Sequence, residues 1–300
     1  MNCQMGAWVI AHDADAARLA LAGVEAFMRA AEATLSRFLP TSALSQLNAR
    51  LGQPTPVVPM LWEVLTLALD SAQATDGLYD PTILDALEAA GYDRSFEQIA
   101  DTSGAAAVPP RPIATWRDIQ LDPATRTVTL PPGVRVDLGG ITKGWAAERA
   151  ADSLARLGSC LVDAGGDLAA RGHPVEWSAW PVGVADPRQP DADLALLMVA
   201  DRGVATSGTD YRRWRRGQTV QHHLIDPRTR RPAQTDLLSV TVVAPTAIAA
   251  DLHAKLALLQ GAAAGLAYLE DLPDVEGLLI SEAGDMGETS GFQQYVYRGD

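Results

Sequence analysis

Apolar residues recur at steps of three and four between residues 16 and 38. This spacing predicts a helix with one buried stripe, ending before Pro40. The stripe consists of Leu21, Val24, Met28, Ala31 and Leu35. Residues 60–74 repeat the pattern directly after Pro59, a residue type favoured in the first turn of a helix. The N-terminal part of the chain is therefore predicted to be mainly helical.

From residue 125 onward, apolar and polar positions alternate, which is typical of strands. We expect a hairpin whose strands, at 125–130 and 134–138, are joined by a turn at 131–133. Further strands are expected at 161–163, 239–243, 277–281 and 294–297, and further helices at 143–157 and 249–259. Because helices come first and a mixture of strands and helices follows, the predicted fold class is α+β.

Residues 104–113 are rich in Ala and Pro and carry no periodic pattern, so a surface loop is expected there. The loop separates a helical lobe at about residues 1–103 from an α+β lobe at about residues 114–300. We expect the two lobes to be intertwined parts of one domain that spans residues 1–300.

Charge and cysteine content exclude several classes of function. The chain has 24 Lys and Arg residues against 37 Asp and Glu residues, a formal charge of −13, which argues against nucleic acid or an anionic membrane as the main partner. Cys3 and Cys160 lie too far apart for a zinc motif and do not indicate a disulfide framework. The N-terminus lacks a basic signal region, and no apolar run reaches the roughly 18 residues of a spanning helix. A cytoplasmic location without membrane insertion is expected.

The first candidate site is a predicted strand that ends in a glycine pair and opens a helix. It reads Asp-Leu-Gly-Gly-Ile-Thr-Lys-Gly from Asp137 to Gly144. A glycine backbone can approach a ligand closely, and helix N–H groups together with the Lys143 ammonium suit the oxygens of a diphosphate. The spacing is neither that of a Walker A loop nor that of a dinucleotide fingerprint. A tight turn with a solvated lysine is the alternative interpretation.

Three further strings place reactive side chains at turns or on a helix. Residues 163–167, Asp-Ala-Gly-Gly-Asp, can hold a hard cation or form a simple turn. His223 precedes Asp226 by three residues, and its imidazole suits proton transfer. Asp251 and Lys255 are four residues apart on an apolar helix, so they share a face and can pair. Each string also has an ordinary explanation as a polar turn or an ion pair.

Taken in order, these strings resemble the ApbE family of flavin transferases, and the resemblance runs nearly from end to end. It rests on Met5-Gly6, Leu35-Ser36-Arg37-Phe38, Ser42 to Asn48, Gly77 to Thr82, Asp137 to Gly144, the Gly-Gly-Asp turn at 165–167, Thr206-Ser207-Gly208, His223 to Thr229 and Ala250 to Ala254. Such enzymes cleave FAD, release AMP and attach FMN to a Ser or Thr hydroxyl of an acceptor protein with the help of Mg²⁺. The implied fold is ApbE-like (T-fold-like), with mixed sheets and packed helices.

The resemblance implies roles for individual residues. Lys143 would contact FAD and take part in catalysis, and His223 would be the general base. The metal positions are the backbone carbonyl of Gly140, the carboxylate of Asp251, and Lys255, which stands where the family usually has Thr. The residues matching the flavin or adenosine pocket are Met5, Phe38, Leu78, Tyr79, Asp80, Asp137, Lys143, Ile225 and Ala254.

Lys255 is the main departure from the family pattern, because an ammonium cannot ligate Mg²⁺ unless it is deprotonated. The ammonium can stand in for part of the metal's charge, the metal can bind elsewhere, or transfer can be lost. The alternatives to FMN transfer are therefore FAD binding without transfer and hydrolysis of FAD to FMN and AMP.

Partners of such enzymes present a short Ser/Thr-Gly-Ala-Thr-like string. The nearest match in this chain, residues 103–106, ends in Ala, so modification of the chain by itself is not expected.

Overall fold

The structure is a computed structural model that describes residues 4–104, 107 and 114–299. The described chain forms two compact units, each built from separate segments. The first unit contains residues 29–142 and 212–234, and the second contains residues 4–28, 143–211 and 235–299. The division into lobes around residues 104–113 stays a prediction, and most of that loop lies outside the described residues.

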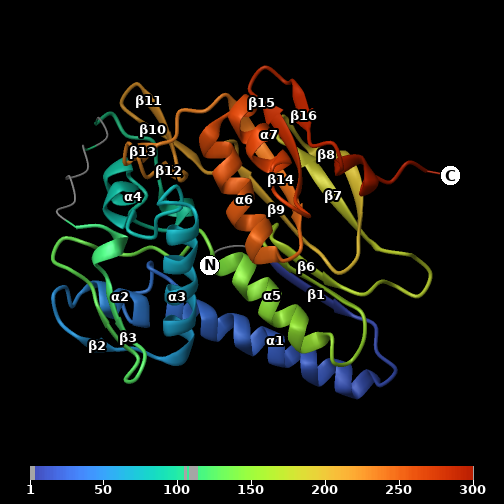
Figure 1. Cartoon of the computed structure of the whole chain (residues 1–300), viewed down its shortest axis with the longest axis horizontal. Coiled ribbons are helices and arrows are strands. Elements are labelled where there is room, and N and C mark those ends of the chain that lie inside the picture. Colours follow the sequence, from blue (N-terminus) through green and yellow to red (C-terminus); the bar gives the residue numbers. More distant parts are fainter. Residues whose placement is uncertain (1–3, 105–106, 108–113, 300) are drawn as a thin grey trace. The chain divides into compact units, whose positions relative to one another are not determined.

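A seven-stranded antiparallel sheet is the main element of the second unit (Figure 1). Its strands follow the spatial order β1, β5, β6, β9, β14, β15, β16, and each neighbouring pair is antiparallel. The strands are β1 (Met5–Val9), β5 (Cys160–Ala164), β6 (Leu168–Arg171), β9 (Gly203–Gly208), β14 (Leu237–Ala244), β15 (Glu276–Ser281) and β16 (Met286–Glu288). Strand β14 is buried along almost its whole length, as expected for a strand that is covered on both faces.

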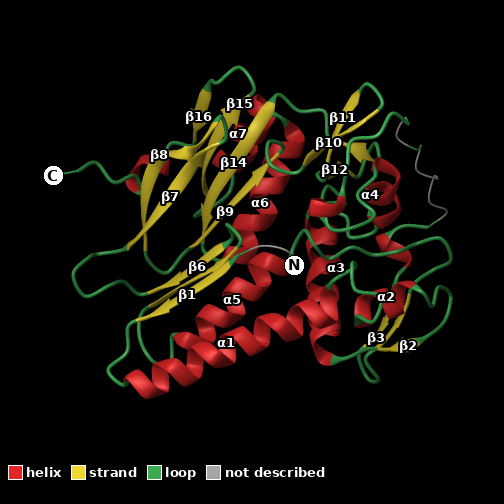
Figure 2. Ribbon diagram, turned by 180° about the vertical axis from the view of Figure 1, so that it is seen from behind, coloured by secondary structure: helices red, strands yellow, loops and turns green. Residues whose placement is uncertain are grey.

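Helices cover one face of this sheet and a long hairpin covers the other (Figure 2). Helix α6 (Ala247–Gln260) contacts β9 and β14, and helix α7 (Ala262–Glu270) contacts β15. The hairpin consists of β7 (Trp180–Asp186) and β8 (Gln189–Val199), and the 3₁₀ turn η3 (Phe292–Gln294) follows the sheet. Residues of β7 are alternately buried and exposed, and its buried side chains join Val243 of β14 in one apolar core.

The first unit is mainly helical and contains only short strands. Its elements are α2 (Ala43–Asn48), β2 (Thr55–Pro56), α3 (Pro59–Ala74), α4 (Leu84–Ala90), η1 (Phe96–Gln98), η2 (Trp116–Asp118), β3 (Gln120–Asp122), β4 (Thr127–Thr129), β10 (Arg213–Arg216), β11 (Thr219–His222), β12 (Ile225–Asp226) and β13 (Arg231–Pro232). Helices α1 (Ala14–Leu35) and α5 (Thr142–Leu154) contain points where the chain passes between the units.

Most of the predicted elements are confirmed, and with them the α+β class. Helices α1 and α3 bury most of the predicted stripes, and Pro59 occupies the first turn of α3. Helices α5 and α6 and strands β5, β14 and β15 also form where expected. Every helix among the described residues is too short or too polar to span a bilayer.

The predicted hairpin at residues 125–138 is wrong. Strand β4 does form, but it pairs with β2 and β3, and residues 134–138 are not a strand. The Asn48 side chain takes the place of a partner strand: its Nδ2 donates to the carbonyl of Val136, and its Oδ1 accepts from the N–H of Val136, both at 2.8 Å. The next N–H, of Asp137, donates to the carbonyl of Pro81.

The strand predicted at residues 294–297 is also wrong. This segment belongs to the turn around η3, where the N–H of Tyr295 donates to the carbonyl of Phe292. Val296 forms a single antiparallel bridge to Leu197 of β8, and hydrogen bonds from Met198 N–H to Tyr295 and from Tyr297 N–H to Leu196 flank it. The turn around η3 thus limits the pairing with β8 to one bridge, which is too short for a strand.

Candidate active site

In the second unit, α5 and α6 approach each other closely at Gly144. A Cβ atom at this position would lie 2.6 Å from the carbonyl oxygen of Ala247 and 3.1 Å from the Cβ of Asp251. Only a glycine allows the two helices to pack at this distance. The crossing therefore places Lys143, in the first turn of α5, beside the part of α6 that carries Asp251.

A second contact fixes the same crossing. The Glu148 carboxylate of α5 accepts a hydrogen bond from the N–H of Ala247, at the start of α6, at 2.7 Å. Glu148 also forms an ion pair with Arg171 of β6, and this pair helps to compensate its buried charge. Helix α5, helix α6 and the sheet are thus joined around one carboxylate.

Lys143 forms an ion pair with Asp167, whose carboxylate lies in the turn between β5 and β6. Lys143 Nζ lies 2.6 Å from Asp167 Oδ2, and the Asp167 side chain is only 1% exposed. Gly165 and Gly166 in this turn have φ values of 72° and 92°, which L residues with a side chain rarely adopt. The solvated lysine that the sequence left open is thereby excluded, since Lys143 is paired with a buried acid.

One turn of α6 supplies a second buried pair. Lys255 Nζ lies 3.2 Å from Asp251 Oδ1, and the two side chains are 16% and 6% exposed. The other carboxylate oxygen of Asp251, Oδ2, is buried without a hydrogen-bond partner. The i,i+4 pair predicted from the sequence is present, but it is buried and not a solvated surface pair.

The two pairs form one electrostatic group, which we call the lysine–aspartate cluster: Lys143, Asp167, Asp251 and Lys255. Burial, followed by the negative charge of Asp251, raises the pKa of Asp167 to about 7. The ammonium groups of Lys143 and Lys255 act in the opposite direction on the same carboxyl group. With both carboxyl groups ionised the four charges sum to zero, and protonation of Asp167 leaves the cluster with a net positive charge.

This cluster does not form a Mg²⁺ site as it stands. The Asp251 carboxylate, which would be its ligand, has one oxygen without a hydrogen-bond partner, but its other oxygen already faces the Lys255 ammonium, which cannot ligate a cation. The described part of the chain contains no group of three or more His, Cys, Asp or Glu side chains that could bind a metal ion. The ligand set of Gly140, Asp251 and Lys255 stays a prediction.

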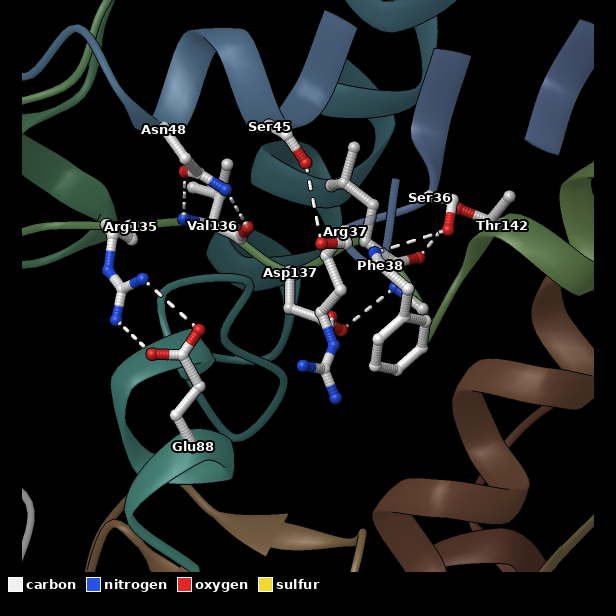
Figure 3. A network of polar contacts seen from close by, with 12 residues as sticks. Ser36, Arg37, Phe38, Ser45, Asn48, Glu88, Arg135, Val136, Asp137 and Thr142 are labelled. Carbon is white, nitrogen blue, oxygen red and sulfur yellow. Dashed lines mark hydrogen bonds and ion pairs between the residues drawn. The ribbon is translucent and has the colours of Figure 1, made fainter. Parts of the chain in front are cut away.

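In the first unit, a buried ion pair joins Arg37 to Asp137 (Figure 3). Arg37 Nε lies 2.8 Å from Asp137 Oδ2, and the Arg37 side chain is 7% exposed. The other oxygen of Asp137, Oδ1, accepts a hydrogen bond from the N–H of Gly139 at 2.9 Å. Asp137 therefore holds both Arg37 and the glycine pair of its own motif in place.

Aromatic rings surround the Arg37 guanidinium. Its central carbon lies 4.1 Å from the ring centre of Phe38 and 4.5 Å from that of Tyr92. Burial is the largest cause of the raised pKa of the Tyr92 phenol. The His223 ring lies edge-on to Tyr92, with 6.3 Å between ring centres. Arg37, Phe38, Tyr92 and His223 thus form one continuous aromatic and cationic group.

The same aromatic group is anchored to the core of the first unit. Tyr92, Trp214 and Ile225 belong to one buried cluster, and Phe38 packs against it. The indole N–H of Trp214 donates to the carbonyl of Ala90 at the end of α4, at 2.9 Å. The ring of Tyr92, which lies next to His223, is therefore held in the core of the first unit by Phe38 and Trp214.

A model of the ApbE family matches residues 2–279. The chain belongs to the ApbE family. Among its relatives, the FAD:protein FMN transferase of Treponema pallidum (strain Nichols) is 32% identical over 281 residues, which cover 87% of this chain and 76% of that protein. The FAD:protein FMN transferase of Salmonella typhimurium (strain LT2) is 31% identical over 226 residues, 72% of this chain and 64% of that protein.

Solved ApbE structures share the fold. The ApbE protein of Thermotoga maritima superposes with a TM-score of 0.84 and 25% identity, covering 97% of this chain and 96% of that chain. The Pseudomonas stutzeri flavinyl transferase ApbE, in its apo form, gives a TM-score of 0.79 at 21% identity and covers 99% and 98% of the two chains. The ApbE-like mixture of sheets and helices is therefore confirmed.

The residues that the ApbE resemblance singles out fall into two sets. Phe38, Leu78, Tyr79, Asp80, Asp137, Gly140, His223 and Ile225 lie in the first unit, and Met5, Lys143, Asp251, Ala254 and Lys255 lie in the second. Within the second set, Met5 pairs with Ala164, next to the turn that carries Asp167. Ala254 is fully buried on α6, one turn after Asp251.

In the first set, Asp80 and Tyr79 belong to a turn that lies beside Asp137. Asp80 Oδ1 accepts hydrogen bonds from the N–H and the hydroxyl of Thr82, at 2.7 and 2.6 Å. The N–H of Asp137 donates to Pro81 within the same turn. The side chain of Tyr79 is buried, and that of Leu78 is half-buried.

Sequence reasoning did not assign roles to Asp167, Arg37 or Tyr92. Asp167 closes the Asp-Ala-Gly-Gly-Asp turn, for which the sequence predicts either a cation site or a simple turn. Arg37 lies inside the Leu-Ser-Arg-Phe string, and its neighbour Phe38 was chosen instead. No local pattern marks Tyr92, whose position follows from packing between distant segments.

Proposed function

We propose that this protein transfers FMN from FAD to a Ser or Thr hydroxyl of an acceptor protein and releases AMP. The observation that carries the proposal is the lysine–aspartate cluster. In a chain with a formal charge of −13, a diphosphate needs local positive charge, and buried carboxylates hold two ammonium groups for that purpose. Lys143, Asp167 and Asp251 belong to the strings that resemble the ApbE family, and relatives of the chain in that family are named for this activity.

The reaction exchanges one phosphorus–oxygen bond for another. The acceptor hydroxyl oxygen attacks the phosphorus on the FMN side of the diphosphate. A phosphoester to the acceptor forms, the bond to the AMP phosphate breaks, and AMP leaves with the bonding electron pair. Catalysis of such a step depends mainly on positioning and on compensation of negative charge.

In this proposal Lys143 and Lys255 provide the compensating charge. Lys143 is held by Asp167 and Lys255 by Asp251, so neither ammonium has to be oriented when FAD binds. Such preorganised charge is worth more in a buried site than in water. The family resemblance implies assistance by Mg²⁺, and metal titration tests whether this chain, with Lys255 at the Thr position, needs it.

His223 is the proposed general base that takes the hydroxyl proton. A neutral imidazole can accept a proton near neutral pH, and the ring of Tyr92 packs edge-on beside that of His223. Phe38 and Tyr92 supply flat apolar surface suited to the rings of FAD.

The acceptor string and the location belong to the same proposal. We propose a Ser/Thr-Gly-Ala-Thr-like string as the target, presented by another protein. The match at residues 103–106 ends in Ala, and residues 105–106 lie outside the described part of the chain. The cytoplasmic location stays a prediction from the sequence.

The experiment that tests this function is the intact mass of an acceptor peptide. The protein is incubated with FAD, Mg²⁺ and a peptide that contains Ser-Gly-Ala-Thr. The matched control peptide carries Ala and Val in place of Ser and Thr. We expect a mass increase corresponding to one FMN on the first peptide and none on the second. An unchanged peptide with tightly bound FAD would favour binding without transfer, and free AMP with an unchanged peptide would favour hydrolysis.

A further inference from the structure

The Asp251–Lys255 pair determines which positive charge, an ammonium or a metal ion, can compensate the FAD diphosphate in the proposed reaction. Asp251 is the acid that the family resemblance assigns to a divalent cation, yet its Oδ1 faces the Lys255 ammonium at 3.2 Å. Both side chains are largely buried, so little water screens this contact. A dication at Asp251 would have to compete with a lysine that is already in place.

The surroundings of the pair strengthen this competition. Lys143 brings a second ammonium to the same cluster, held at 2.6 Å from Asp167. The two pairs are neighbours, because a Cβ on Gly144, the residue after Lys143, would lie 3.1 Å from the Cβ of Asp251. Both carboxylates of the cluster are already paired with an ammonium, so a divalent cation beside Asp251 would have to displace Lys255 or rely on the diphosphate of FAD alone for compensating charge.

One carboxylate oxygen of Asp251 has no hydrogen-bond donor in the cluster. Oδ2 is buried without a hydrogen-bond partner, although the other oxygen is paired. One hydrogen-bond donor can satisfy this oxygen, and so can a Mg²⁺ ion whose other ligands are diphosphate oxygens and waters, so the position of Lys255 decides between them. Lys255 has three N–H donors and no acceptor, so it contributes charge but no ligand.

We infer that Lys255 replaces the divalent cation in this protein. The inference rests on the proposed function: the ammonium of Lys255, fixed by Asp251, supplies beside the FAD diphosphate the charge that a bound metal would otherwise supply. FMN transfer then proceeds without a stoichiometric divalent cation. Changing Lys255 to Thr removes the competing charge and adds a hydroxyl oxygen, and this change turns the cluster into a cation site.

The test measures metal binding separately from activity. Mn²⁺ serves as the probe, and the free ion is counted by electron paramagnetic resonance with wild-type protein, Lys255→Thr and Lys255→Met, each with FAD present. Lys255→Met is the matched control, because it removes the charge without adding an oxygen. Circular dichroism of each variant verifies the fold. In parallel, FMN transfer is followed with EDTA and with increasing Mg²⁺.

We expect wild-type protein to bind Mn²⁺ at least tenfold more weakly than Lys255→Thr, with Lys255→Met in between. EDTA should leave wild-type transfer within twofold of its value in Mg²⁺, whereas Lys255→Thr should require Mg²⁺. One tightly bound Mn²⁺ per wild-type chain, or loss of wild-type transfer in EDTA, would overturn the inference; neither measurement needs a variant. Absence of transfer under all conditions would contradict the proposed function, and Mn²⁺ binding would still decide the inference.

Discussion

Gly144 lies against Asp251 where helices α5 and α6 cross, and a Cβ on Gly144 would lie 3.1 Å from the Cβ of Asp251. The same atom would lie 2.6 Å from the backbone oxygen of Ala247, which cannot rotate away as a side chain can. The glycine of the Lys-Gly dipeptide therefore sets the distance between the two helices that carry Lys143 and Lys255. Small errors in that distance would displace both ammonium groups.

Gly144→Ala is expected to lower the free energy of unfolding by about 1–3 kcal/mol, the usual cost of overpacking a closed interface. Gly23→Ala is the matched control, since Gly23 lies within helix α1 and a Cβ there would meet nothing within 4 Å. That control should gain about 0.5–1 kcal/mol from helix propensity. Urea unfolding of both variants measures the difference. Equal stability of the two variants would show that the crossing is looser than described.

Asp167→Asn is expected to change how stability depends on pH. Burial raises the pKa of Asp167 to about 7, above the ordinary value of 3.8, so the folded protein binds this proton more tightly than the unfolded chain does. The contribution of Asp167 to stability is thus fully present below pH 4 and is lost as the pH rises through 7. Relative to wild type, Asp167→Asn should gain at least about 1 kcal/mol between pH 5 and pH 8.

Urea unfolding of both proteins at pH 5, 6, 7 and 8 measures this gain. If the free energy of unfolding depended on pH in the same way in both proteins, the pKa of Asp167 would not be raised by folding. The prediction would then be wrong.

His223→Ala is expected to lower kcat for transfer by a factor of about 10²–10⁴, the range for loss of a general base. FAD affinity should change much less, because the rings of Phe38 and Tyr92 remain. His222→Ala is a useful comparison: the His222 ring is buried, with Nε2 3.0 Å from the carbonyl of Ala233, so its loss should lower stability and leave kcat per folded molecule largely unchanged. Retention of kcat within tenfold in His223→Ala would exclude it as the base.

Arg37→Lys is expected to weaken FAD binding by about tenfold, because a lysine keeps the charge near Asp137 but loses the flat contact with Phe38 and Tyr92. Arg37 Nη2 is also buried without a hydrogen-bond partner. Arg135→Lys is the control, since Arg135 pairs with Asp85 and Glu88 in the same unit. Quenching of flavin fluorescence gives the affinities. Equal affinities for wild type and Arg37→Lys would limit Arg37 to a role in stability.

The sequence predicted those parts of the fold that depend on local periodicity. Helices α1 and α3 and strand β14 each carry an unbroken apolar pattern, and this pattern predicts both that the element forms and whether it is a helix or a strand. Residues 134–138 also alternate, yet they are not a strand, because their partner is the side chain of Asn48, which is distant in sequence. Strand β7 was missed although it alternates, since Pro181 and Gly183 weaken its strand propensity.

The sequence predicted which residues belong to the site, but it did not predict which of them pair with each other. Motifs identified Lys143, Asp251 and His223 as candidates, and the resemblance to the ApbE family gave them roles. Lys143 pairs with Asp167 because the turn between β5 and β6 brings Asp167 to the start of α5. Neither residues 137–144 nor residues 163–167 predict this pairing by themselves. The burial of the Asp251–Lys255 pair likewise comes from the packing of α6 against the sheet.

The ratio of AMP released to FMN attached, measured in one reaction, tests transfer most directly. Wild-type protein is mixed with FAD and the Ser-Gly-Ala-Thr peptide, AMP is quantified by chromatography, and flavinylated peptide is quantified by its intact mass. Transfer predicts one AMP for each flavinylated peptide at every time point. AMP in large excess over modified peptide, or no AMP at all, would contradict it.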